Sequence, residues 1–342
     1  MKIFILLAHS DWFADLTKEQ QQEYINEHPN SKYAKGTQSD NEKTLSDADD
    51  LKSAQDKRIR PALTTKFVDG KRMAANGKPL PEHIQKLSLP PAWTDVLYNP
   101  DPDGALLARG KDSKGRVQSV YSEKFANQQA EAKFSRVKEL SKEFPSIQAQ
   151  NGKNRKSSNS STKDAADCLH LIMTMGIRPG SKNNTKAEKQ AYGATTLKAE
   201  HVIDGKPMKL KFVGKDGVDL ELPVISPELA KMLRERASQA VSNKDGNTSL
   251  FPNTSDTAVL KYTHTLDGGH FKTKDFRTHL GCSVAQEAIK NMDPPKDAKE
   301  YKAHVRKIAV LVSSKLGNTP TIALSSYIAP ELFASWRMSI TK

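Results

Sequence analysis

The sequence predicts an α+β protein, with a small N-terminal β-sheet domain and a larger, mainly helical C-terminal domain that contains a three-stranded β element. Short apolar runs with turn residues between them fill residues 57–128, which is typical of strands. From about residue 130 the apolar spacing becomes helical. Alternation returns between residues 197 and 224, in three runs separated by Asp-Gly-containing turns. A chain of 342 residues is long enough for two domains of ordinary size.

Charge divides the chain further. Residues 1–55 hold six lysines against ten acidic residues, so they carry −4, and the remaining 287 residues carry +17 of a net +13. We therefore expect an acidic, partly flexible extension over 1–55, a β-rich domain over 56–129 and a helical domain over 130–342. Such a basic body favours a polyanionic partner, nucleic acid before an anionic membrane surface, although some basic proteins are merely soluble.

Several classes of protein are disfavoured. The two cysteines, Cys168 and Cys282, lie in apolar helical patterns and are expected to be reduced and buried. The sequence has no Cys/His cluster with zinc spacing and no glycine-rich phosphate loop, so we expect no metal, nucleotide or other cofactor. Residues 1–8 are apolar but too short for a signal peptide, and no run could span a bilayer, so we expect a cytoplasmic, DNA-associated location and no membrane partner.

In the β-rich domain, the proline-rich segment 87–93 ends in Trp93, an expected aromatic anchor. Strands are expected over 96–98, 105–109 and 116–121, with a turn at 111–115. The last hairpin could reach DNA phosphates through its cations and base edges through its glutamine. Its candidate DNA-binding residues are Lys111, Lys114, Arg116, Gln118 and Tyr121, with Gln118 and Tyr121 expected on one face. A solvated hairpin without a ligand is the alternative.

In the helical domain, a helix over 132–144 is followed by an expected polar loop over 151–162. The next helix carries an apolar stripe from Ala165 to Met175 and ends at Gly176. Pro179 prevents the helix from continuing, which places Arg178 at a rigid corner, where it either points into a site or lies on the surface.

Three strands are expected next, over 197–203, 208–213 and 218–224, with Lys215 at the second tip. A lysine at such a tip is most often simply solvated. Helical patterns resume over 227–240, before a loop in which Phe251 is an expected anchor.

Two further helices lead to the C-terminal part of the chain. One begins near Thr273, a plausible N-cap, and contains Arg277; the other, over 299–316, is amphipathic. Gly317 ends the second helix, Pro320 begins a new one, and this corner presents Asn318 and Tyr327. Considered alone, the corner is more typical of a helix–turn–helix with a buried tyrosine than of a functional site.

Two arginines, a lysine, an amide and a tyrosine are the residue types of a metal-free phosphoryl-transfer site. Tyrosine can act as a nucleophile that forms a covalent ester. Guanidinium groups grip phosphate oxygens and stabilise the charge of the transition state, and losing one such donor costs about 10²–10³ in rate. A lysine with a lowered pKa could protonate a leaving oxygen.

Several segments together resemble the type IB DNA topoisomerases of the poxvirus and bacterial kind. They occur in the family's order and cover roughly residues 57–333. Each segment is weakly diagnostic by itself, but together they are specific. They are Leu89–Trp93, Gly110–Arg116, Tyr192–Leu197, Lys211–Lys215, Lys274–Thr278, and Leu316–Pro320 with Ser326–Ile328.

The resemblance implies a role for each candidate residue. Tyr327 resembles the nucleophile that forms a 3′-phosphotyrosyl link, and Lys215 the hairpin lysine that protonates the 5′-hydroxyl leaving group. Arg178 and Arg277 resemble the phosphate-binding arginines. Asn318 stands where poxvirus enzymes have His and many bacterial ones Asn. Lys274 is a possible supporting residue, at a position where the related tyrosine recombinases usually carry His.

The implied activity is ATP- and metal-independent relaxation of double-stranded DNA by a monomer that clamps the duplex, nicks one strand, allows rotation and reseals. Ser119 stands where poxvirus enzymes have Tyr, so the preferred cleavage site is expected to differ. Pro179 also departs from the usual residue before Gly180. A tyrosine recombinase or integrase and a non-catalytic DNA-binding protein of the same fold are the alternatives.

Overall fold

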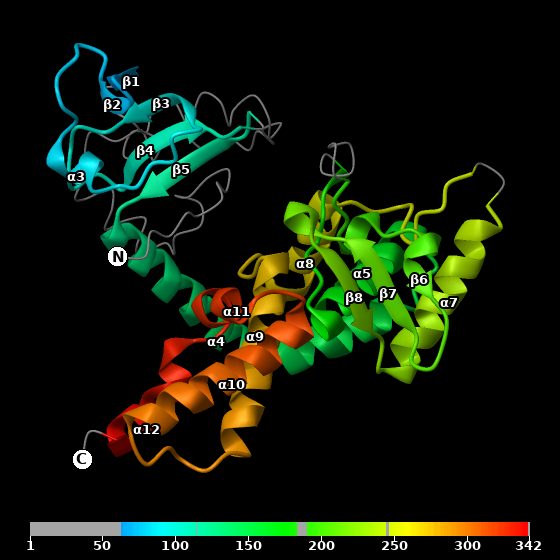
Figure 1. Cartoon of the computed structure of the whole chain (residues 1–342). Coiled ribbons are helices and arrows are strands. Elements are labelled where there is room, and N and C mark those ends of the chain that lie inside the picture. The colour runs from blue at the N-terminus through cyan, green and yellow to red at the C-terminus, as the bar shows by residue number, and fades with distance from the viewer. Residues whose placement is uncertain (1–62, 114, 183–189, 244–245, 341–342) are drawn as a thin grey trace. The chain divides into compact units, whose positions relative to one another are not determined.

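A computed structural model describes residues 63–113, 115–182, 190–243 and 246–340 of the chain. The chain forms two compact units, Met1–Ala132 and Lys133–Lys342 (Figure 1). The acidic extension expected over 1–55 lies outside the described residues. The domain borders expected after residues 55 and 129 therefore stay predictions.

The first unit contains a five-stranded antiparallel sheet in the order β2-β1-β3-β4-β5. Two of its strands, β1 and β2, were not expected from the sequence. They are joined by Asp69-Gly70, both with positive φ, which is the geometry of a two-residue type I′ hairpin. The elements are β1 Leu63–Val68, β2 Lys71–Ala74, α3 Glu82–Gln85, β3 Thr94–Tyr98, β4 Leu106–Lys111 and β5 Val117–Tyr121.

Trp93 is buried against this sheet, which confirms it as an anchor, and it packs with Val96, Ala108 and Val120. A second cluster surrounds Ile84 of α3. One expectation for the sheet is wrong. Side chains of β5 alternate between faces, so Gln118 and Tyr121, three residues apart, cannot share one face.

The second unit is mainly helical. Helix α4 begins in the first unit and continues into the second. It runs far beyond the helix expected over 132–144 and includes Asn151, so the polar loop expected over 151–162 is confined to 155–159. Asn151 is buried; its amide donates to the Ala166 carbonyl and accepts from the Tyr262 hydroxyl. The α-helices are α4 Glu123–Asn154, α5 Ser160–Met175, α7 Pro227–Val241, α8 Asp256–Asp267, α9 Thr273–Lys290, α10 Ala298–Leu316, α11 Pro320–Ser326 and α12 Ala334–Ile340.

A three-stranded antiparallel sheet, β6-β7-β8, lies within this unit as expected. Its first strand is short, because residues 194–201 instead form two 3₁₀ turns. The tip between β7 and β8 is a third such turn, and it carries Lys215. The elements are η2 Ala194–Thr196, η3 Ala199–His201, β6 Val202–Ile203, β7 Lys209–Val213, η4 Lys215–Gly217, β8 Asp219–Pro223 and η5 Pro330–Phe333.

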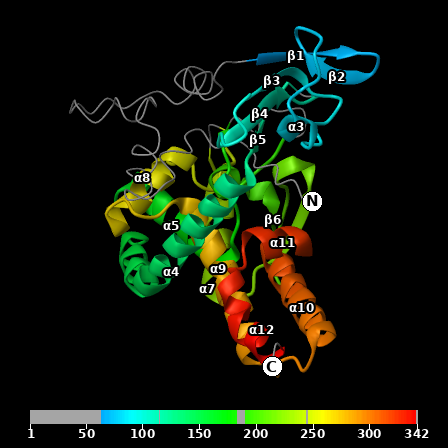
Figure 2. The ribbon, with the colours of Figure 1, turned by 90° about the vertical axis from the view of Figure 1, so that its left-hand side faces the viewer.

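Two apolar clusters form the core of the second unit. One surrounds α5, including Leu169 and Ile172 on the predicted stripe. The other joins α9 to α12 around Val312 and Trp336, and both views show α10 and α11 together at this end of the unit (Figures 1 and 2). Phe251 is buried in the first cluster, as expected.

The corner between α10 and α11 has the predicted form. Gly317 caps α10 in the left-handed conformation, with φ of 61°. The Thr319 side chain accepts from the Ile322 N–H, and Pro320 is the first helical residue of α11. At α9, however, the N-cap is Lys272 rather than Thr273, and the Asp275 carboxylate accepts from the Lys272 N–H at 3.1 Å.

Within the described ranges, no helix combines the length and the apolar character needed to cross a membrane.

Candidate active site

Tyr327 lies at the C-terminal end of α11, between two arginine side chains. Its hydroxyl is 3.4 Å from Nη2 of Arg178, and the guanidinium carbon of Arg277 is 4.8 Å from the centre of its ring. The structure therefore brings together three predicted site residues from segments 149 residues apart in the chain.

The two arginines oppose the effect of burial on the Tyr327 phenol. Burial raises the pKa of Tyr327, but the charges and hydrogen bonds of Arg277 and Arg178 lower it by more, so the net pKa falls below the ordinary tyrosine value. A lowered pKa gives more phenolate at a given pH, and phenolate is the nucleophilic form.

Arg178 is fixed by the backbone of the Tyr192–Leu197 segment. The Arg178 carbonyl accepts from Ala194 N–H at 2.8 Å, and the Pro179 carbonyl accepts from Thr195 N–H at 2.8 Å. Gly180 and Gly193 are in direct backbone contact: a Cβ on Gly193 would lie 2.5 Å from the Gly180 Cα. Glycine is thus needed at both positions, where the two segments cross. The unusual Pro179 lies in this corner and is bound there through its carbonyl.

Arg277 is buried in α9, where it binds the ends of two other helices. Its Nη1 donates to the Gly176 carbonyl at the end of α5, and its Nη2 donates to the Leu316 carbonyl, at 2.8 Å, at the end of α10. Carbonyls at helix C-termini favour a cation. Its Nε is buried and has no hydrogen-bond partner among the described residues.

Asn318 follows directly from this corner. Its N–H donates to the Ser313 carbonyl at 3.1 Å, but both Oδ1 and Nδ2 of its side chain are buried without a partner in the described part of the chain. An unsatisfied buried amide costs about 1–3 kcal/mol. A side chain kept in this state, two residues after the Leu316 carbonyl that holds Arg277, is typical of a group that meets a ligand.

Lys215 is exposed on η4, and its hairpin contacts the same corner. A Cβ on Gly317 would lie 2.9 Å from Cδ2 of Leu220 in β8, so strand and corner are in close contact. Near the same tip, at the end of β7, the Val213 carbonyl accepts from Tyr192 N–H at 2.7 Å. Lys215 is connected to the site through these contacts, whereas Tyr327, Arg178 and Arg277 touch directly.

A second group of cations lies on α4 and α9, and two of its members interact with Tyr327 or with the residue before it. Burial lowers the pKa of Lys274, and Tyr327 is among the groups that interact with its charge. Lys133 of α4 donates from Nζ to the Ser326 carbonyl at 2.9 Å, and Arg136 pairs with Asp275 at 3.3 Å. Lys133 was not predicted, and no signal in the sequence could have found it, because its partner is 193 residues away.

The predicted DNA-binding side chains of the first unit are paired with carboxylates. Lys111 Nζ lies 2.7 Å from Asp95, and Arg116 lies 2.8 Å from Asp112. Gln118 is only 5 % exposed and donates to the same Asp112 carboxylate at 2.9 Å. Tyr121 packs on Phe125 with ring centres 5.3 Å apart, and Lys114 lies outside the described residues.

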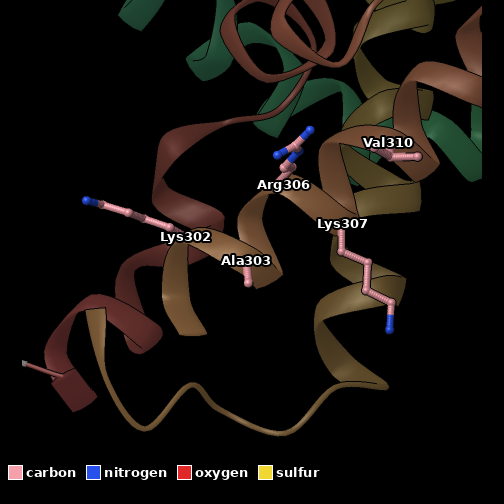
Figure 3. A pocket seen from close by; sticks show the side chains of 5 residues that line it. All are labelled: Lys302, Ala303, Arg306, Lys307 and Val310. Carbon is pink, nitrogen blue, oxygen red and sulfur yellow. The ribbon is translucent and has the colours of Figure 1, made fainter. Parts of the chain in front are cut away.

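The exposed face of α10 adds a basic surface that the sequence analysis did not single out. Lys302, Arg306 and Lys307 surround a shallow hollow with Ala303 and Val310, and their charged ends point away from the helix (Figure 3). This hollow contains none of the predicted site residues. Among the described residues, no cluster of His, Cys, Asp and Glu could hold a metal ion.

Comparisons with known proteins agree with this architecture. Residues 122–331 match the family model described as the catalytic core of eukaryotic DNA topoisomerase I, and residues 67–112 match the N-terminal domain of bacterial DNA topoisomerase IB. A protein of Acanthamoeba polyphaga mimivirus named DNA topoisomerase 1B is 28 % identical over 260 residues, which cover 72 % of this chain and 77 % of the viral protein.

The chain therefore belongs to the type IB DNA topoisomerases, and the predicted fold class is confirmed. It is an enzyme that acts on DNA and changes its topology.

Proposed function

We propose that this topoisomerase relaxes supercoiled duplex DNA, without ATP or a metal ion, through a transient single-strand break in which Tyr327 holds the 3′ end. The contact of the Tyr327 hydroxyl with Arg178, beside Arg277, is the observation that carries the proposal. The same constellation would serve a tyrosine recombinase, but the family matches in both units favour the topoisomerase.

In the proposed cleavage step, the Tyr327 phenolate attacks the scissile phosphorus. The new bond joins Oη to phosphorus while the bond between phosphorus and the 5′ oxygen breaks. Lys215 gives a proton to that oxygen, which leaves as a 5′-hydroxyl. Religation is the reverse reaction, and the phosphotyrosyl ester conserves the energy of the broken bond, so no external energy source is needed.

The remaining residues act on the phosphate. Arg178 and the unpaired Nε of Arg277 supply positive charge and donors where negative charge develops. The unsatisfied Asn318 amide donates to a phosphate oxygen, which gives this buried group the partner that it lacks. Lys274 adds positive charge close to Tyr327.

DNA binding is the proposed role of the β4–β5 hairpin, through Lys111, Lys114, Arg116, Gln118 and Tyr121. Because Asp95 and Asp112 hold several of these side chains, phosphates must compete with carboxylates for the cations. We further propose that the enzyme acts as a monomer, associated with cytoplasmic DNA. The divisions after residues 55 and 129 are part of the same proposal.

The test is relaxation of a supercoiled plasmid in EDTA without ATP. Wild type and Tyr301→Phe, which removes a different tyrosine hydroxyl of the second unit, should relax the plasmid fully. Tyr327→Phe should bind the plasmid but leave it supercoiled. Full relaxation by Tyr327→Phe would contradict the assignment of Tyr327 as the nucleophile. Strand exchange between partner sites without relaxation would favour the recombinase.

A further inference from the structure

The backbone of Tyr327 is held from three directions. The Tyr327 N–H donates to the Ala323 carbonyl at 2.9 Å inside α11. From α9, a Cβ on Gly281 would lie 3.0 Å from the Tyr327 Cβ, and Cys282 Sγ is 3.5 Å from the Tyr327 carbonyl. The third direction is α4, through Lys133.

Lys133 holds the peptide unit that leads into Tyr327. Its acceptor, the Ser326 carbonyl, belongs to the same planar peptide group as the Tyr327 N–H. That carbonyl is also among the last of α11, which have no partner inside the helix. The N–H of this peptide group is thus held by Ala323 and its carbonyl by Lys133. The peptide plane therefore has little freedom to rotate, and this fixes the backbone from which the Tyr327 side chain extends.

A short helix needs such support. The α11 helix has only seven residues, and Tyr327, its C-cap, has φ of −129° and ψ of 0°, which is already non-helical. Helices of this length are not stable by themselves in water, so their ends depend on tertiary contacts. Without a partner, the end of α11 would fray and Tyr327 would leave Arg178 and Arg277.

We propose that Lys133 is a positioning residue for the nucleophile, whose hydrogen bond to the Ser326 carbonyl holds Tyr327 against the two arginines. This inference rests on the proposed role of Tyr327.

The surroundings of Lys133 distinguish positioning from proton transfer. The pKa of Lys133 is lowered to about 8, mainly by burial; Lys274 and Arg136 also lower it, whereas Cys282 and Asp275 raise it. A lysine of this pKa could in principle give a proton to a leaving group. However, its observed partner is a backbone carbonyl, and both the charged and the neutral amine donate to a carbonyl.

The test compares three variants of the full chain in single-turnover cleavage of a duplex, with DNA affinity measured separately. Lys133→Met should cut the cleavage rate by about 10- to 100-fold, as expected for displaced reacting groups, while affinity changes less than about threefold. Lys133→Arg keeps a cationic donor and should restore most of the rate. Lys138→Met removes an exposed charge from the same helix and should cleave like wild type.

A substrate with sulfur in place of the 5′ bridging oxygen separates the two roles, because a thiolate leaves without being protonated. It should restore cleavage by Lys215→Met but not by Lys133→Met. Rescue of Lys133→Met would make Lys133 a proton donor and overturn the proposal, as would a wild-type rate for Lys133→Met on the natural substrate.

If wild type itself forms no covalent adduct, the proposed function fails instead. If Lys133→Met does not fold, Lys133→Arg carries the test: a cleavage rate close to wild type with unchanged affinity supports positioning, and a large loss of rate in this folded variant overturns it.

Discussion

At the scale of single residues, the site depends on how much positive charge surrounds one phenol. Burial alone would make Tyr327 a poorer nucleophile, since it disfavours the phenolate. Arg277 and Arg178 reverse that effect, and the net pKa of Tyr327 is lowered. If Tyr327 is the nucleophile, as proposed, its phenolate is favoured even in the protein without DNA.

Removing one of these charges should therefore raise the pKa of Tyr327. The phenolate is the charged form, so a cation lowers the pKa and its loss raises it. We expect the tyrosinate absorbance of wild type minus Tyr327→Phe to titrate at lower pH than the ordinary value of about 10. In an Arg178→Ala background, the same difference should titrate at higher pH than in wild type. Equal midpoints in the two backgrounds would contradict the assigned cause.

Asn318 offers a second prediction at this scale. Its buried amide has no partner among the described residues, so its removal should not lower the free energy of unfolding. Catalysis should suffer, because a phosphate donor is lost: we expect Asn318→Ala to slow cleavage by about 10²-fold. Urea unfolding and single-turnover cleavage measure the two effects. A destabilised variant that cleaves at the wild-type rate would show that the amide is structural.

Some of this residue-level arrangement could be predicted and some could not. The identities of Tyr327, Arg178 and Arg277 follow from motifs, and the structure places them in contact. Two contacts could not be predicted: the hydrogen bond of Gln118 to Asp112 and that of Lys133 to Ser326. Both depend on how side chains from different strands or distant helices meet in the folded protein. No local pattern encodes such contacts.

At the scale of elements, the approach of α9 to Tyr327 depends on Gly281. A Cβ at this position would lie 2.7 Å from the Tyr327 carbonyl oxygen, closer than atoms pack. Glycine inside a helix normally lowers its stability by about 0.5–1 kcal/mol. Its presence here allows Tyr327 to lie directly against the helix that carries Arg277.

Replacing Gly281 with alanine should displace Tyr327 and slow cleavage by at least about tenfold. Overpacking should also lower the free energy of unfolding by about 1–3 kcal/mol. Gly152→Ala is the matched control: this glycine lies in α4 with open space around it, so alanine should add about 0.5–1 kcal/mol and leave cleavage unchanged. Similar cleavage rates for the two variants would show that Gly281 does not position Tyr327.

The elements themselves were predictable where local signals are strong. Gly176 and Gly317 end their helices in the left-handed conformation, as expected. The β1–β2 hairpin was missed although its Asp69-Gly70 turn is a strong hairpin signal. The end of α4 was mistaken for a loop, because residues such as Asn151 are polar but are buried by tertiary contacts.

At the scale of the whole molecule, the basic body suits a polyanion. Residues 56–342 carry +17, and part of this charge lies on the exposed α10 face, in a hollow that contains none of the predicted site residues (Figure 3). Phosphate neutralisation releases counterions, so affinity for DNA should depend strongly on salt. Charge alone indicated only a polyanionic partner; the ordered motifs indicated the topoisomerase family, which the comparisons confirm.

The central claim is that Tyr327 carries the 3′ end of the broken strand. Denaturing the enzyme during cleavage and digesting the trapped adduct with trypsin tests it directly. Residues 316–337 contain no internal lysine or arginine and a single tyrosine, so they should be released as one peptide. Its mass should include a nucleotide joined through a 3′ phosphate to Tyr327. An adduct on another peptide, a link to the 5′ end, or relaxation without any adduct would contradict this account.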